Sequence, residues 1–192
     1  MKRSALLFIL GVLMSTTMGA EAKSPVAPEP EEMNEPEEIQ LDERLKDLDY
    51  FARQWTCMRS TQGSSEMANP YQWTVTQELN DFWYLGRGET QSGVHTQQDT
   101  LGYNTIFKKF GRTILGNDST FANFLSSGWN ENQIVWVGTS SNLAIGQTAK
   151  HKIVMTKISE QAFTSEEYRV GEEPDSWEAI ATQICAATDS DS

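Results

Sequence analysis

The chain of 192 residues contains only two cysteines and two histidines. So few thiol and imidazole side chains exclude a multi-cysteine zinc site, and two cysteines cannot build a disulfide-rich miniprotein. Basic residues are also scarce, because 15 Lys and Arg stand against 27 Asp and Glu, which gives a net charge of −12. Binding to a nucleic-acid backbone needs clustered basic side chains, so the acidic balance excludes that class of function.

Motifs of known catalytic and phosphate-binding sites are missing as well. The sequence has no G-x-S-x-G, no H-E-x-x-H and no G-x-x-x-x-G-K-[ST]. His95 lies in the polar segment 91–99, and His151 lies between Lys150 and Lys152, so a surface role is favoured over metal ligation for each. We therefore expect no cofactor, no metal and no enzymatic activity.

The longest apolar run, Ala5–Met14, is short and lies at the N-terminus. It follows the basic start Met1–Arg3 and precedes Ala20–Ala22, whose A-x-A pattern is typical of a cleavage site. This layout predicts a secretory signal peptide at residues 1–22, cleaved near Ala22, with an uncleaved anchor as the alternative. No later segment is long enough to cross a bilayer, so we expect an exported, periplasmic or extracellular protein with no membrane span.

Two segments with different patterns follow. Residues 23–38 consist mainly of Pro and Glu, which predicts a disordered acidic tether, with a docking arm for a basic partner as the alternative. Within residues 39–54, apolar side chains recur at helical spacing, at Leu41, Leu45, Leu48 and Phe51. This pattern predicts a short amphipathic helix. Its polar face carries both charge signs, so packing on the domain is favoured over a membrane surface.

From residue 54 onward the hydrophobic pattern has a period of two, and turn residues separate the segments. Ten strands are expected, at 54–59, 71–79, 82–90, 100–107, 112–117, 121–127, 133–140, 151–158, 162–170 and 177–186. Strands do not alternate with helices, which argues against a parallel α/β sheet. The pattern predicts one mainly β domain at 39–188: an antiparallel up-and-down barrel, or a sandwich, with a short N-terminal helix. A barrel is preferred because closure removes the sheet edges, and 189–192 is expected to be a flexible tail.

The two cysteines fall in the first and the last expected strand, at Cys57 and Cys185. In a closed meander those two strands are neighbours, so the pair would bridge the closing seam. Export and the even count favour a disulfide. Two buried, unpaired thiols are the alternative.

Several short segments carry a resemblance to a known family. They are Leu48–Cys57, Gly102–Asn104, Asn117–Ser119, Ser127–Trp129, Ile134–Gly138 and Trp177–Cys185. In this order they resemble the uncharacterised DUF1579-type proteins, which belong with the lipocalin-like, calycin-type barrels. The resemblance covers about residues 41–186 and implies a ten-stranded barrel with a helix near one end and no established activity.

The chain departs from these relatives at identifiable positions. Arg53 stands where the G-x-W opening of lipocalin-like barrels has Gly, and Asn104 stands where the family usually has Asp. Gln54–Cys57 also differs from the Gly-rich opening of the haem-binding nitrobindin relatives, so haem is not expected.

Large side chains in the strands indicate either a packed core or the wall of a cavity, because a barrel of ten strands need not be filled by side chains. The candidate ligand-lining residues are Trp73, Trp83, Arg87, Trp136 and Met155. If Arg87 points inward it could meet an anionic ligand group, and if it points outward it is a surface charge. The leading hypothesis is non-enzymatic binding of a small apolar or amphipathic ligand. A structural or interaction module of the cell envelope and an enzyme acting inside the barrel are the alternatives.

Overall fold

The structure is a computed structural model that describes residues 42–62, 70–171, 173 and 176–188. They belong to the unit of the chain that begins at Ile39. The expected signal peptide (1–22), tether (23–38) and tail (189–192) lie outside the described residues. Among the residues that are described, no helix has the length and apolar character needed to cross a membrane.

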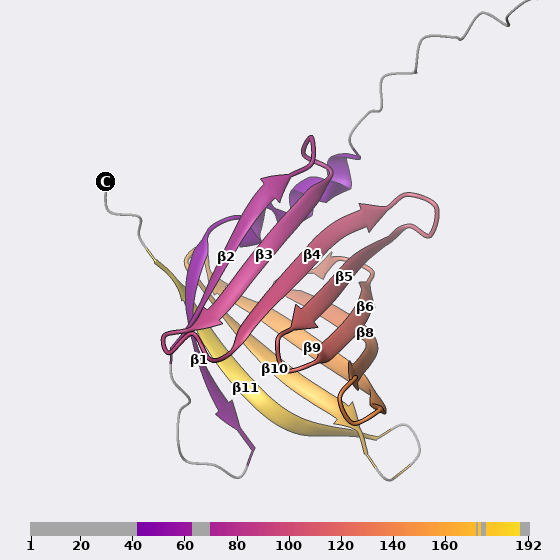
Figure 1. The fold of residues 1–192 in the computed structure, drawn as a ribbon. Helices are drawn as coiled ribbons and strands as arrows, with labels where there is room; N and C mark the ends of the chain where they lie inside the picture. The colour runs from indigo at the N-terminus through magenta and orange to yellow at the C-terminus, as the bar shows by residue number, and fades with distance from the viewer. Residues whose placement is uncertain (1–41, 63–69, 172, 174–175, 189–192) are drawn as a thin grey trace, which may run out of the picture. The chain divides into compact units, whose positions relative to one another are not determined.

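Eleven antiparallel strands form a single sheet, and ten of them close into a barrel (Figure 1). The strands are β1 (Gln54–Thr61), β2 (Tyr71–Glu78), β3 (Trp83–Thr90), β4 (Thr96–Asn104), β5 (Lys109–Gly116), β6 (Thr120–Ser126), β7 (Trp129–Asn130), β8 (Gln133–Asn142), β9 (Gln147–Ser159), β10 (Ala162–Val170) and β11 (Trp177–Ala187). Hairpin neighbours pair along β1–β6 and β8–β11, while β6–β8 and β1–β11 pairing completes the ring. The two-residue β7 pairs only with β8. The predicted mainly β, up-and-down barrel is confirmed.

Three strands begin three or four residues earlier than the period-two pattern predicts, and one of them, β5, starts at Lys109 and not at residue 112. β4 starts at Thr96 and not at residue 100, because Asp99 is a buried polar residue where an inward-facing apolar one is expected. β9 starts at Gln147 and not at residue 151, and its first four residues are all exposed, so their side chains do not alternate between a buried and an exposed face.

A 3-10 helix, η1 (Glu43–Phe51), lies at one end of the barrel, as the indigo segment of Figure 1 shows. Leu45, Leu48 and Phe51 are buried, as the helical spacing predicts. The Phe51 ring stacks on Trp129, with ring centroids 5.5 Å apart, and the Trp129 indole donates to the Asp47 carbonyl at 2.7 Å. These contacts attach the helix to the strands.

Two tyrosines also attach η1 to the barrel. The Tyr50 hydroxyl lies 2.9 Å from the carbonyl oxygens of both Ser159 and Ala162, at the β9–β10 turn. The Tyr84 hydroxyl, on β3, donates to the Asp49 carboxylate. The helix is therefore bonded to strands on different sides of the ring, and it covers this end of the barrel.

A disulfide joins Cys57 and Cys185 across the β1–β11 seam, which confirms the predicted pair. The two residues are direct partners in the register, with Cα atoms 4.0 Å apart, and both are buried. Near the helix end of the seam, the Thr188 amide donates to the Gln54 carbonyl at 2.9 Å. The first and last strands are thus held together by backbone and covalent bonds.

Candidate functional site

A cavity of about 460 Å³ lies inside the barrel. Its lining includes His95 and Asp118, in and beside the β3–β4 and β5–β6 turns, whereas η1 contacts Trp129 and Ser159 at the opposite ends of the strands. The hairpin topology places those two sets of turns at opposite ends of the ring. The cavity therefore opens at the end of the barrel away from the helix.

The deeper part of the cavity wall is apolar. It comprises Trp73, Ile114, Phe124, Ile153, Met155 and Phe163, which come from five different strands. Below them, toward η1, the aromatic core packs without lining the cavity, and Phe51 lies 6.0 Å from Phe163 between ring centroids. The core therefore fills the helix end of the barrel and leaves the other half open.

Two glycines of β3 make room for the aromatic rings of β2. A Cβ atom on Gly88 would lie 1.6 Å from the Tyr71 hydroxyl oxygen, and one on Gly86 would lie 2.6 Å from Nε1 of Trp73. Because glycine has no side chain, both rings can lie across β3 toward β4. The Gly86-Arg87-Gly88 segment thus shapes the inner wall through its two glycines.

Asp99 on β4 and Arg112 on β5 form an ion pair in the middle of the barrel. Arg112 Nη2 donates to Asp99 Oδ2 at 2.6 Å, and Gln97 Nε2 donates to Asp99 Oδ1 at 3.1 Å. The Arg112 side chain is 8% exposed and that of Asp99 is 0% exposed. Burial raises the pKa of the Asp99 carboxyl, and the charge and hydrogen bond of Arg112 oppose that rise. A neutral Asp99 would leave the arginine charge buried and uncompensated, so we assign the pair as ionised.

The Arg112 side chain crosses from β5 toward two other walls. Its guanidinium carbon lies 5.3 Å from the centroid of the Trp73 ring, a cation–π contact. Its Nη1 lies 3.9 Å from the Met155 sulfur on β9. The arginine therefore borders the cavity while Asp99, which does not line it, holds the arginine from behind.

Besides the Tyr103 hydroxyl and the Trp136 indole N–H elsewhere, three hydrogen-bond donors near this pair have no partner among the residues that the structure describes. They are the Tyr71 hydroxyl, the Trp73 indole N–H and the Arg112 Nε–H, and all three atoms are buried. The Trp73 N–H lies close to Asp99 but does not reach the geometry of a hydrogen bond. Burial raises the pKa of Tyr71, so its hydroxyl is protonated at neutral pH. Buried polar groups of this kind are rare, because leaving them unpaired costs free energy.

The mouth of the cavity is lined by paired ionisable groups. Arg59 on β1 and Glu167 on β10 are 2.7 Å apart, and His95 Nδ1 lies 3.8 Å from the Asp118 carboxylate. Burial lowers the pKa of His151, and the nearby Glu167 opposes that shift only in part. At neutral pH the mouth therefore combines the Arg59–Glu167 ion pair with a neutral His151 imidazole.

The structure separates the five candidate lining residues into three groups. Trp73 and Met155 line the cavity. Trp136 is fully buried in the apolar core, outside the cavity lining. Trp83 is 43% exposed and its ring covers Gly102, while Arg87 is exposed on the same outer face of β3. Arg87 is thus a surface charge, the second of its two expected orientations.

Sequence reasoning did not single out Tyr71, Asp99 or Arg112. A signal for the ion pair does exist, since Asn104 and Lys109 bound the β4–β5 turn and the hairpin register then pairs Leu101 with Arg112. Residues two positions apart on a strand share a face, so that register places Asp99 diagonally opposite Arg112.

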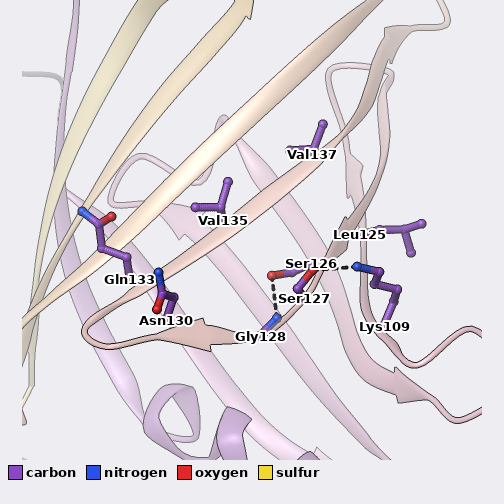
Figure 2. A pocket seen from close by; sticks show the side chains of 9 residues that line it. All are labelled: Lys109, Leu125, Ser126, Ser127, Gly128, Asn130, Gln133, Val135 and Val137. Atoms are coloured by element: carbon purple, nitrogen blue, oxygen red, sulfur yellow. Dashed lines mark hydrogen bonds between the residues drawn. The ribbon is translucent and has the colours of Figure 1, made fainter.

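A second hollow, of about 440 Å³, lies on the outer surface along β6 and β8 (Figure 2). The side chains of Leu125, Val135 and Val137 border it and are partly exposed. Several of its polar groups are engaged with one another, because Lys109 Nζ donates to the Ser127 hydroxyl at 2.6 Å and the Gly128 amide to the Ser126 hydroxyl at 3.1 Å. The barrel interior, with its unpartnered donors, is the stronger candidate site.

Comparison with protein-family models and with curated proteins finds no match to this chain. The geometry of the barrel interior is therefore the basis for assigning a function.

Proposed function

We propose that the protein is an exported, non-enzymatic binding protein that holds a small amphipathic molecule inside the barrel. The observation that carries this proposal is the cavity of about 460 Å³, whose wall is apolar in depth and polar at the Arg112 side and the mouth. Sites for small molecules usually measure about 300–1,000 Å³ and combine an apolar wall with a few polar groups. The interior matches that description in volume and in chemistry.

The disulfide supports export. Bonds of this kind persist in oxidising compartments and are rare in a reducing cytosol. Cys57 and Cys185 are 128 residues apart in the sequence and join the β1–β11 seam. They do not form the C-x-x-C motif that would indicate a redox catalyst. A structural disulfide and the expected signal peptide at residues 1–22 point to the same compartment.

The pairing of ionisable groups supports binding over catalysis. A general acid or base needs a titratable group free to exchange a proton with substrate. Asp99 is held by Arg112 and Gln97, and Glu167 is held by Arg59. These carboxylates already accept charged or polar donors, so they fix the shape of the wall.

Titration with small amphiphiles tests the proposal. We choose three probes with a ten-carbon chain, the carboxylic acid, its methyl ester and its primary amide, at concentrations where they remain monomeric. Because Trp73 lines the cavity, binding is expected to change the intrinsic tryptophan fluorescence saturably, with one molecule bound per chain. Calorimetry gives the stoichiometry independently.

Two variants of matched chemistry locate the bound probe. Ala122 on β6 is buried and lines the cavity, so Ala122→Phe places a ring inside it. Ala186 on β11 is exposed on the outer face, so Ala186→Phe adds the same ring outside. We expect binding to weaken at least tenfold in the first variant and to be unchanged in the second. Ile114→Trp fills the cavity from β5, and it replaces Ala122→Phe in the test if that variant does not fold. Binding of no probe, or equal binding by all variants, would refute the proposal.

A further inference from the structure

Resting on this proposed function, we propose that the ligand carries an uncharged hydrogen-bond acceptor, such as an amide or ester carbonyl oxygen, which accepts from Tyr71 and Arg112. The apolar part of the ligand then packs on the opposite wall of the cavity. The inference specifies the chemical class of the ligand's polar end.

The unpartnered donors near the Asp99–Arg112 pair belong to one part of the wall. An indole N–H and a guanidinium N–H can only donate, and a tyrosine hydroxyl can donate as well as accept. Tyr71 and Trp73 lie two positions apart on β2 and share its inner face, and the Arg112 guanidinium lies 5.3 Å from the Trp73 ring. Tyr71 and Arg112 line the cavity, and neither the Tyr71 hydroxyl nor the Arg112 Nε–H has a partner in the described part of the chain. A hydrogen-bond acceptor on the ligand would give these donors a partner.

The charge of Arg112 is already compensated. Its Nη2 lies 2.6 Å from the Asp99 carboxylate, and the pair is buried. At the mouth, Arg59 is likewise paired with Glu167 at 2.7 Å. A carboxylate ligand beside Arg112 would bring a second negative charge close to Asp99 and would lose its own hydration in the process. A carbonyl oxygen accepts the same hydrogen bonds with neither penalty.

One Arg112 donor remains without a partner. Its Nη2 faces Asp99 and its Nη1 faces the Met155 sulfur, so Nε–H is the donor left over. The apolar contacts for the rest of the ligand come from Phe124, Ile153 and Phe163, which line the same cavity. The cavity wall thus has hydrogen-bond donors for the polar end of the ligand and apolar side chains for its hydrocarbon part.

The three ten-carbon probes distinguish the two kinds of ligand. At pH 8 the acid is ionised, whereas the amide and the ester are neutral. We expect the wild-type protein to bind the amide and the ester at least tenfold more tightly than the carboxylate. Tyr71→Phe removes one donor and keeps the ring, so it should weaken amide binding about fivefold. Tyr168→Phe, whose hydroxyl bonds Glu166 and does not line the cavity, should leave amide binding unchanged.

Asp99→Asn gives the sharpest test, because it removes the compensating charge and keeps the shape. Arg112 then lacks an anionic partner, and we expect the preference to invert, with the carboxylate bound more tightly than the amide. Thermal unfolding and circular dichroism check that the variant is folded, and the Tyr71→Phe comparison stands if it is not.

The outcomes separate the two proposals. Tighter binding of the carboxylate by the wild type, or equal amide binding by wild type and Tyr71→Phe, overturns the inference and leaves a binding barrel in place. Failure of all three probes to bind, or binding that Ala122→Phe and Ile114→Trp leave unchanged, overturns both.

Discussion

Reduction of the Cys57–Cys185 disulfide should lower the free energy of unfolding substantially. The bond closes a loop with a sequence separation of 128 residues, which contains nearly the whole barrel. In the chain-entropy model a loop of that size restricts the unfolded chain by about 5 kcal/mol at 25 °C. Since domains are commonly stable by about 5–15 kcal/mol, the reduced protein should be close to its unfolding threshold.

The assay compares guanidinium unfolding of the oxidised and the reduced protein, followed by tryptophan fluorescence. Both cysteines are buried, so reduction needs unfolding first and refolding in the presence of a phosphine reductant. The denaturant dependence should also steepen on reduction, because the unfolded chain without the bond is less compact. The double variant Cys57→Ala with Cys185→Ala is the control, and reductant should leave its unfolding unchanged.

A small effect would refute the reasoning. If the reduced and oxidised proteins differ by less than about 1 kcal/mol, the loop-closure argument fails for this barrel. The seam would then depend on its backbone ladder and side-chain packing alone.

Two further predictions concern the cavity wall and its mouth. Gly88→Ala should cost about 1–3 kcal/mol in denaturant unfolding, because its Cβ would lie 1.6 Å from the Tyr71 hydroxyl oxygen and displace the ring. Gly111→Ala, where the added Cβ meets open space, should cost less than half as much, and equal losses would contradict the steric argument. Burial holds the pKa of His151 below 6.5, so the unfolded chain takes up a proton there before the folded protein does, and stability falls as pH drops below about 6.5. His151→Gln should reduce the fall in the free energy of unfolding between pH 7 and pH 5. An unchanged slope would show that other groups cause this pH dependence.

Most of the fold is encoded in local patterns. Alternation of apolar and polar side chains and turn residues located ten strands, and the two cysteines located the closing seam. Alternation fails where the inward-facing residue is polar, and Asp99 therefore hid the start of β4. The expected helix is a shorter 3-10 helix, Glu43–Phe51, because its contacts with strand ends at Ser159 and Trp129 decide its geometry.

The site was harder to predict for a related reason. Alternation separates a strand into two faces but does not tell which one is inside. On β3 the bulkier face, with Trp83 and Arg87, lies outside, and the face with Gly86 and Gly88 lies inside. The inner face can be small because rings from the neighbouring strand occupy the space above the glycines. That information belongs to the cross-strand register, which one strand's sequence does not contain.

The β1–β11 seam also has a consequence for the order of assembly. Of the strand pairs that the structure describes, this one alone joins strands distant in the chain, whereas the others form between near neighbours. Local hairpins close short loops and form early, while a contact between distant segments waits until the intervening chain is ordered. We therefore expect the ring to close last, with oxidation of Cys57 and Cys185 following that step. The oxidation state of the two thiols would then report whether a given molecule has completed its barrel.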